Sequence, residues 1–475
     1  MNYETVIGLE VHLHLNTKTK AFCGCSTEFG KQPNTQVCPV CLGLPGSLPV
    51  FNQIALDYAI KVALALNCKI QEYTKFDRKN YFYPDLPKNY QISQYDLPLS
   101  RDGFLEIKIN GKAKRIGITR VHMEEDAGKL IHESTESLVD FNRTGVPLLE
   151  IVSEPEISSP EEAHEYLAAL KSLIEYLDVS DCDMEKGSLR CDANISLRKK
   201  GEKELGIKTE LKNMNSFKAV KDALAHEEKR QAELLDAGKT LAQETRCWDT
   251  KELKTISMRT KEGSQDYRYF PEPDLPEFII NEEWIARLKE GIPELPQEKM
   301  RRFIKEFGLS EYDAKILTAS KRDSFFAEEC MQAYLGQDKK LVVNWFIGPM
   351  LSEANERNCA LSDLGLSVVG LIELIGYVDR NEISHLSAKI VLTEMIASGK
   401  PAETIIGEKN LIQVSDSVSL NDIIEEAVKE NSKSVADYQA GKENALMFLV
   451  GQVMRKSKGK ANPKAVQDLL KEKFK

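Results

Sequence analysis

A strict alternation of apolar and polar side chains near the start of the chain constrains its fold more than any other feature. From Ile7 to Leu15 every odd position is apolar, and Glu10, His12 and His14 occupy even positions between them. Successive side chains of a β-strand point to opposite faces of the sheet. The segment is therefore predicted to be a half-buried strand whose polar face carries a carboxylate and two imidazoles.

Two later segments, 189–198 and 207–212, repeat this alternation and are also predicted to be strands. Their polar positions are Arg190, Asp192, Asn194, Ser196, Arg198, Lys208, Glu210 and Lys212. Helices are predicted between strands, one beginning after Ser159 and one after Ser216, since each serine can act as an N-cap. Strands and helices alternate here without a regular βαβ rhythm. This predicts an α+β fold built on a mixed, mainly antiparallel sheet.

The pattern becomes helical after a proline-rich segment that begins near residue 271. The prolines of this segment are Pro271, Pro273, Pro276, Pro293 and Pro296. A chain of 475 residues exceeds the size at which one core keeps growing, so several domains are expected. We predict a catalytic domain over 1–292, a helical domain over 293–407 and a small helical tail domain over 408–475.

Charge is distributed unevenly along the chain, whose formal net charge is −10. Between Lys442 and Lys475, nine Lys or Arg against three Asp or Glu leave +6 there and −16 on the remainder. Arg455, Lys456, Lys458 and Lys460 form the densest part of this basic end. An acidic body with a basic end is compatible with a local nucleic-acid contact. A solvated helix end is the alternative.

Neither a membrane-spanning segment nor a secretory signal is expected. No apolar run approaches the ~20 residues that a membrane-spanning helix needs. The start, MNYETVIGLEV, lacks the basic and apolar regions of a signal peptide. We therefore expect a cytoplasmic protein without membrane contact.

Four cysteines, Cys23, Cys25, Cys38 and Cys41, crowd into the loop after the first predicted strand. Each short pair places two thiolates within reach of one ion, and the intervening loop lets the pairs complete a tetrahedron. The spacing predicts a zinc knuckle over 23–41. Because four protein ligands leave no open position for water, such a zinc would be structural. The alternative is a set of four thiols without metal.

Carboxylates accumulate on the polar faces of the predicted strands. They are Glu10, Glu124, Glu125, Asp126, Glu150, Asp192 and Glu210. Such groups on one sheet face repel each other unless cations lie between them. Magnesium is the natural candidate, because it prefers oxygen ligands and keeps positions open for substrate phosphates. The alternative is that these are solvent-facing side chains of an exposed sheet.

A P-loop is not the basis for nucleotide binding in this chain. The nearest string, 201–209, has one residue too many before its lysine and runs into strand-like alternation instead of a helix. A phosphoryl-transfer enzyme of this kind would need carboxylate-held magnesium on a sheet, with basic residues on the phosphates.

Several long motifs occur in one order along the chain. They are GLEVHLHLNTKTKAFCGCS at 8–26, RKNYFYPDLPKNYQISQYD at 78–96, VDFNRTGVPLLEI at 139–151, LRCDANISLR at 189–198 and KTELKNMNSF at 208–217. Together they resemble the signature of the B subunits of aspartyl/glutamyl-tRNA amidotransferases, and the resemblance spans the whole chain. It implies a catalytic domain similar in fold to glutamine synthetase.

The resemblance also implies an activity and partners. The B subunits of this family bind misacylated tRNA and use ATP to phosphorylate the side-chain carboxylate of glutamyl-tRNA(Gln) or aspartyl-tRNA(Asn). Ammonia from the amidase, or A, subunit then displaces phosphate, and the small C subunit completes a heterotrimer. The sequence does not indicate which of the two tRNAs is the physiological substrate.

Site residues follow from matching the motifs position by position. The resemblance implies a magnesium site at Glu10, His12, Glu125 and Glu150, with Asp192 and Glu210 as further candidates, and zinc at the four cysteines. For ATP and the aminoacyl end it suggests Lys79, Tyr81, Lys88, Arg190 and Asn194.

Two other functions fit part of the sequence. A zinc-containing tRNA-binding scaffold would account for the cysteines and the basic tail, although it leaves the carboxylate-rich strand faces unexplained. A free-standing carboxylate–amine ligase acting on a small molecule would leave the helical third and the tail unexplained. Measuring ATP turnover with and without misacylated tRNA would separate all three functions.

Overall fold

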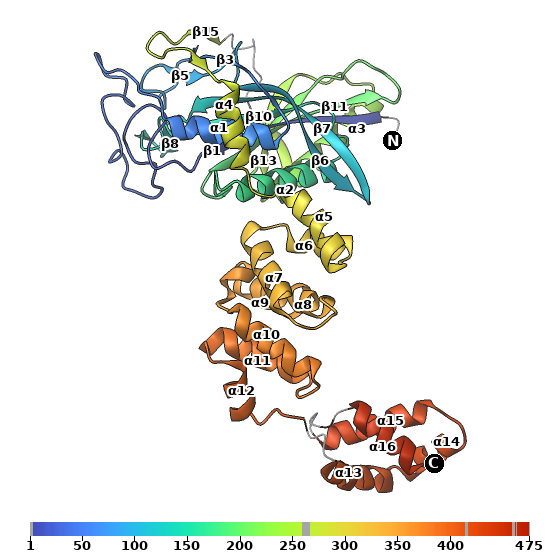
Figure 1. Cartoon of the computed structure of the whole chain (residues 1–475). Coiled ribbons are helices and arrows are strands. Elements are labelled where there is room, and N and C mark those ends of the chain that lie inside the picture. The colour runs from blue at the N-terminus through green and yellow to red at the C-terminus, as the bar shows by residue number, and fades with distance from the viewer. Residues whose placement is uncertain (1–2, 259–266, 414–416, 458–460, 462, 475) are drawn as a thin grey trace. The chain divides into compact units, whose positions relative to one another are not determined.

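The computed structural model describes residues 3–258, 267–413, 417–457, 461 and 463–474. The chain divides into two compact units, Met1–Pro296 and Gln297–Lys475 (Figure 1). The first contains one hydrophobic core, and the second contains two separate ones, over 303–406 and 424–470. The predicted α+β fold with a helical C-terminal region is confirmed, and the three-domain division stays a prediction.

A nine-stranded sheet forms the centre of the first unit. In spatial order its strands are β14 (Lys254–Ser257), β13 (Glu244–Asp249), β12 (Thr209–Lys212), β11 (Leu189–Lys199), β1 (Tyr3–His14), β10 (Pro147–Ser153), β7 (Lys112–Glu125), β6 (Ser100–Ile109) and β2 (Lys69–Ile70). All neighbouring strands are antiparallel except β12 and β13, which are parallel. The mainly antiparallel sheet predicted from alternation is thus confirmed.

One face of this sheet is apolar and is covered by helices. The apolar positions of β1 are fully buried, with Ile7, Val11 and Leu13 at 0% exposure. Helices α2 (Pro160–Tyr176) and α3 (Phe217–Asp236) pack against each other and against β6 and β11, respectively. The predicted N-cap serines begin both helices, and each accepts a hydrogen bond from a first-turn amide. The polar side chains of β1, which alternate with these apolar ones, therefore lie on the opposite face of the sheet.

Small sheets and a further helix complete the first unit. A three-stranded sheet has the order β15 (Arg268–Pro271), β4 (Asp77–Asn80), β5 (Tyr90–Ser93), and its β5 packs against β7. The two other pairs are β16 (Phe278–Ile279) with β3 (Tyr73–Thr74), and β8 (Lys129–His132) with β9 (Ser137–Asp140). Helix α1 (Gln53–Ala65) packs against α4 (Glu282–Glu290) and β7.

The second unit consists of helices. Around its first core lie α5 (Pro296–Phe307), α6 (Glu311–Leu317), α7 (Lys321–Ala333), α8 (Lys340–Trp345), η1 (Phe346–Met350), α9 (Leu351–Arg357), η2 (Leu361–Leu364), α10 (Val368–Asp379), α11 (His385–Ser398) and α12 (Ala402–Glu408). Around its second core lie α13 (Ser417–Glu430), α14 (Ser432–Gln439), α15 (Asn444–Lys456) and α16 (Pro463–Lys473). Among the described residues, no helix combines the length and apolar character that crossing a membrane requires.

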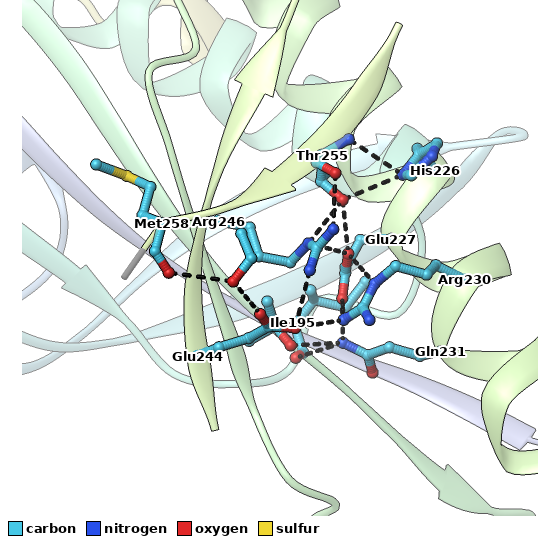
Figure 2. Close-up of polar contacts among 11 residues, drawn as sticks. Ile195, His226, Glu227, Arg230, Gln231, Glu244, Arg246, Thr255 and Met258 are labelled. Carbon is cyan, nitrogen blue, oxygen red and sulfur yellow. Dashed lines mark hydrogen bonds and ion pairs between the residues drawn. The ribbon is translucent and has the colours of Figure 1, made fainter. Parts of the chain in front are cut away.

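A buried ionic network joins α3 to strands β13 and β14. Figure 2 shows Arg230, Gln231 and Thr255 converging on Glu227 of α3, whose side chain is fully buried. The guanidinium of Arg230 donates to both carboxylate oxygens at 2.6 and 2.9 Å, and Arg246 Nε lies 3.6 Å away. Because a buried charge is costly without partners, this network depends on each member being present.

Replacing Glu227 by glutamine is therefore expected to destabilise the first unit by about 1.5–3 kcal/mol, since it removes a buried charged acceptor while Glu244 still pairs with both arginines. Urea unfolding of the full chain measures this change. The matched control is Glu233→Gln on the same helix, where the carboxylate is exposed and 3.9 Å from Lys229. That exposed pair should contribute less than about 1 kcal/mol. Equal effects of both substitutions would show that the buried network is not a source of stability.

Candidate active site on the polar face of the sheet

The polar face of the large sheet carries a row of ionisable side chains across four adjacent strands. In the register of these strands, His122 of β7 lies beside Glu150 of β10, Glu150 beside His12 of β1, and His12 beside Arg190 of β11. Residues directly opposite each other in antiparallel strands share a face. The row therefore brings together groups that lie far apart in the sequence.

A first cluster in this row consists of His12, Glu124 and Glu150. One ligand atom from each lies within 4.8 Å of the others, close enough for one metal ion to bind all three. His122 Nε2 lies 3.0 Å from a carboxylate oxygen of Glu150. Burial alone would raise the pKa of Glu150, but His122, His12 and Lys79 hold that pKa well below its usual range. Glu150 is therefore ionised and available as a cation ligand at neutral pH.

The structure places Glu124 in this cluster, where the sequence motif suggested Glu125. Both residues lie at the end of β7, and consecutive strand residues point to opposite faces. The carboxylate of Glu125 instead lies 2.6 Å from Lys88 Nζ and accepts a hydrogen bond from the amide of Ile92. Both glutamates belong to the same motif, so the motif alone could not show which of them faces the cluster. Their position along β7 could have shown it, because Glu124 is two residues from His122 and therefore lies on the same face of the sheet.

A second acidic cluster lies beside the first and contains Glu10, Asp192 and Glu210. Lys212 Nζ lies between its partners, 2.7 Å from Asp192 and 3.1 Å from Glu210. Burial, followed by repulsion from Glu150, Asp192 and Glu210, raises the pKa of Glu10. The predicted residues Asp192 and Glu210 are thus brought together with Glu10, and Lys212 was not foreseen as a member.

Predicted residue Asn194 supports this second cluster. Its amide nitrogen donates to Glu10 at 3.0 Å, which fixes one oxygen of that carboxylate. Thr245 of β13 donates to Glu210 at 2.7 Å in the same way. Asn194 is therefore engaged with an acidic neighbour, and Thr245 is a supporting residue that sequence reasoning missed.

Asp126 forms a third centre at the same end of the sheet. His14 Nε2, Arg143 Nη2 and Arg190 Nη2 lie 2.6, 2.6 and 2.9 Å from its carboxylate oxygens. Burial would raise the pKa of Asp126, but Arg190, His14 and Arg143 together hold it well below its usual range. Arg190, one of the predicted substrate-binding residues, is therefore held by a buried aspartate.

Lys79 of β4 and two tyrosines that flank the three-stranded sheet, Tyr81 and Tyr267, approach the first cluster. Lys79 Nζ lies 4.8 Å from the ring centre of Tyr267 and 5.9 Å from that of Tyr81. Burial and the nearby Asp85 and Glu124 raise the pKa of Tyr81. The predicted residues Lys79 and Tyr81 are thus brought close to the acidic face, whereas Lys88 lies on Glu125.

The four cysteines form a compact cluster in the loop that follows β1. Their sulfur atoms all lie within 4.8 Å of one another, and those of Cys38 and Cys41 are 3.9 Å apart. Zn–S bonds of about 2.3 Å place the sulfur atoms of a tetrahedral site about 3.8 Å apart. The cluster could therefore hold a metal ion, as the spacing predicted.

The ionisation of these thiols is strongly coupled. A hydrogen bond from Cys23 lowers the pKa of the Cys41 thiol to about 4, although burial opposes this shift. That same interaction raises the pKa of Cys23, and burial raises the pKa of Cys25 to about 11. A cation among the sulfurs would relieve this competition and allow all four to bind as thiolates.

The cysteine loop is also connected to Lys88 and hence to Glu125. Gly43 has a positive φ of 66°, and a Cβ atom there would lie 2.3 Å from Cγ of Lys88. A glycine is thus required both by the left-handed backbone and by the close approach of the lysine. Gly43 and Lys88 also line a cavity of about 160 Å³, whose wall includes Cys23, Cys41 and Gly145.

Comparison with known proteins shows the family to which the chain belongs. Residues 5–286 match the GatB/GatE catalytic domain and residues 325–474 match the GatB domain. The chain is 54% identical to a protein of Carboxydothermus hydrogenoformans and 55% identical to one of Caldanaerobacter subterraneus subsp. tengcongensis, with 99% of each chain covered. It is 52% identical to a protein of Brevibacillus brevis, covering 99% of this chain and 98% of the relative. All three relatives are named as the B subunit of an aspartyl/glutamyl-tRNA(Asn/Gln) amidotransferase. The chain therefore belongs to the family of these B subunits, as its sequence motifs indicated.

Proposed function

We propose that this protein activates the side-chain carboxylate of glutamate or aspartate esterified to tRNA by transferring a phosphoryl group from ATP to it. Ammonia then displaces phosphate, which gives Gln-tRNA(Gln) or Asn-tRNA(Asn). The observation that carries the proposal is the pair of adjacent carboxylate clusters on one sheet face. The names of the relatives, which are amidotransferase B subunits, support the nature of the substrate.

The donor set suits magnesium. His12, Glu124 and Glu150, whose ligand atoms lie within reach of one ion, would hold one Mg²⁺. Glu10, Asp192 and Glu210 are candidates for a second ion, which would displace Lys212 from between Asp192 and Glu210. Glu125, assigned to magnesium by the motif, would instead hold Lys88. When bound, these cations would neutralise the negative charge that develops on the transferred phosphoryl group.

Basic and aromatic residues around the clusters would assist the phosphorylation of the carboxylate. A carboxylate is a poor electrophile because its leaving group would be oxide, and phosphorylation replaces that group with phosphate. Lys79 and Arg190 would bind phosphate oxygens, since both approach the acidic clusters as cations. Tyr81 and Tyr267 would limit the access of water, which would otherwise hydrolyse the acyl phosphate.

The proposed activity requires partners. Ammonia would come from the amidase, or A, subunit, which hydrolyses glutamine, and the small C subunit would complete a cytoplasmic heterotrimer. The complex with both co-expressed partners should form amide on misacylated tRNA and hydrolyse ATP only when that tRNA is present. Supplying ammonium chloride in place of glutamine should sustain the reaction. Amide formation that proceeds without ATP would contradict the proposed activation step.

We also propose that the four cysteines bind one structural zinc. Substitution Cys38→Ser is expected to lose the metal and to destabilise the first unit, because a closed site contributes its binding energy to folding. Elemental analysis of the purified chain should give about one zinc per molecule. Cys247→Ser, a half-buried cysteine of β13, is the matched control and should keep the metal. Metal-free wild-type protein with four alkylatable thiols would contradict the assignment.

The raised pKa of Glu10 predicts that cation binding to the second cluster weakens as the pH falls. A carboxyl group must be ionised to bind magnesium, and a raised pKa means that Glu10 becomes protonated at a higher pH than an ordinary glutamate. Manganese binding followed by electron paramagnetic resonance measures this dependence. In Glu10→Gln the corresponding part of the pH dependence should disappear. An unchanged profile would exclude Glu10 as a ligand.

A further inference from the structure

We infer that Asp126 holds Arg143 and Arg190 as a two-arginine clamp for the phosphoryl group transferred at this site. The inference rests on the proposed phosphoryl transfer and adds to it an arginine, Arg143, and a positioning residue, Asp126. The sequence analysis gave Arg143 no role and counted Asp126 only among the carboxylates that could attract a cation.

Asp126 binds both arginines in a fixed geometry. Its Oδ2 atom accepts from Nη2 and Nε of Arg143 at 2.6 and 3.0 Å, and lies 2.6 Å from His14 Nε2. Its Oδ1 atom accepts from Arg190 Nη2 at 2.9 Å and from the amide of Ala127 at 3.0 Å. Only 4% of the Asp126 side chain is exposed. Both oxygens are thus fully occupied by groups of the protein.

The backbone fixes Arg143 independently of its side chain. Arg143 lies in the connection between β9 and β10, which is tied to Asp126 by two backbone hydrogen bonds. The amide of Gly145 donates to Asp126 O at 3.0 Å, and the amide of Asp126 donates to Val146 O at 2.9 Å. These two backbone hydrogen bonds therefore hold the loop that carries Arg143 next to Asp126.

Both guanidinium groups keep donors for a ligand. A guanidinium has five N–H groups, and Asp126 uses two of Arg143 and one of Arg190. Arg190 Nε is buried and has no hydrogen-bond partner among the residues that the structure describes. Arg190 also lies beside His12 in the strand register, next to the first acidic cluster. Its spare donors are therefore close to where the phosphoryl group would be transferred.

Bound cations would make the local charge favourable for an anion. The two arginines interact electrostatically with Asp126 and with Asp85, Glu124 and Asp192 nearby. Once divalent cations neutralise Glu124 and Asp192, these two carboxylates no longer compete with an anion for Arg190. Guanidinium forks match phosphoryl oxygens in geometry as well as charge.

A phosphoryl group fits this position better than the substrate carboxylate. The transferred group spreads its charge over three oxygens, and the clamp adjoins the cluster that would hold magnesium. The carboxylate of the esterified amino acid carries a single charge that phosphorylation removes. A clamp for the carboxylate would therefore lose its ligand during the reaction.

The test compares the binding of ADP with that of its β,γ-imido triphosphate analogue to the purified three-subunit complex in the presence of Mg²⁺. In Arg143→Ala the affinity for the triphosphate analogue should fall about 10- to 100-fold, as expected for a charge-assisted hydrogen bond, while ADP binding stays unchanged. Asp126→Asn should show the same selective loss. Arg198→Ala, a β11 arginine paired with Glu4, is the control and should bind both nucleotides normally.

Chemical rescue separates a binding role from a purely structural one. Guanidine added to Arg143→Ala should restore the affinity for the triphosphate analogue, whereas Arg143→Lys should not reproduce the lost fork. Equal losses for both nucleotides, or none, would overturn the clamp. An effect confined to the KM for misacylated tRNA would show that the arginines bind the substrate carboxylate and would overturn it as well. If the wild-type complex binds neither nucleotide, the proposed function fails instead.

Discussion

Replacing Glu124 by glutamine should lower tRNA-dependent ATP hydrolysis by roughly 100- to 1,000-fold, because it removes a charged cation ligand at the reacting group. The glutaminase activity of the amidase partner should remain, since the substitution lies in the phosphorylating subunit. Ammonium chloride should not restore amide formation, because the step that fails precedes the arrival of ammonia.

The matched variant is Glu125→Gln, which tests the assignment made from the motif alone. The Glu125 carboxylate forms an ion pair with the buried Lys88 side chain. This substitution therefore leaves Lys88 without its partner and should destabilise the first unit. Manganese binding distinguishes the two glutamates: Glu124→Gln should weaken it, and Glu125→Gln should not. The reverse result would show that Glu125 is the cation ligand. Rescue of either variant by ammonium chloride would point to ammonia delivery.

The strand pattern predicted which residues of each strand would lie on the polar face of the sheet, because alternation is a local property. Glu10, His12 and Asp192 share that face in the folded chain, as their phase indicated. The cysteine spacing likewise predicted a compact cluster, since its short intervals leave the four thiols little freedom. The phase within each strand and the cysteine spacing could be predicted because each depends on residues that are near one another in the sequence. The pairing that brings Asp192 beside Glu10 does not.

The interactions that were missed join distant segments of the chain. Asp126 binds His14, Arg143 and Arg190, which come from three different parts of the chain. Lys212 enters the acidic cluster only because β12 pairs with β11, and this pairing is a consequence of the sheet order. Local periodicity carries no information on strand order, so neither interaction could be predicted without the fold.

The basic tail illustrates how folding changes the interpretation of a charge count. Lys456 lies 2.8 Å from Glu430 and Lys473 lies 3.0 Å from Glu425, both in α13. These two lysines therefore compensate acidic residues of their own domain. The lysines at 458 and 460, which the sequence analysis placed in a basic loop, lie outside the described residues. Among the described ones, Arg455 and Lys471 are exposed.

The double substitution Arg455→Ala and Lys471→Ala is expected to weaken tRNA binding by the complex on the order of 10- to 100-fold at physiological salt. For each phosphate that no longer meets a cationic side chain, the dependence of log affinity on log salt should flatten by about 0.9. The rate of amide formation at saturating tRNA should remain, because the substituted residues belong to the tail and not to the sheet. Affinity measured over a series of salt concentrations checks both expectations.

The control for this variant is the double substitution Lys456→Ala and Lys473→Ala, which removes two lysines paired with α13. Because their charges are already compensated, it should change the salt slope less for each charge removed. Deleting residues 411–475 should weaken binding and flatten the salt slope at least as much as the substitution of Arg455 and Lys471. If affinity and slope are unchanged after the deletion, the tail contributes solubility alone, and the rest of the complex holds the tRNA. If the two double substitutions change the salt slope equally, net charge rather than a surface of defined residues attracts the nucleic acid.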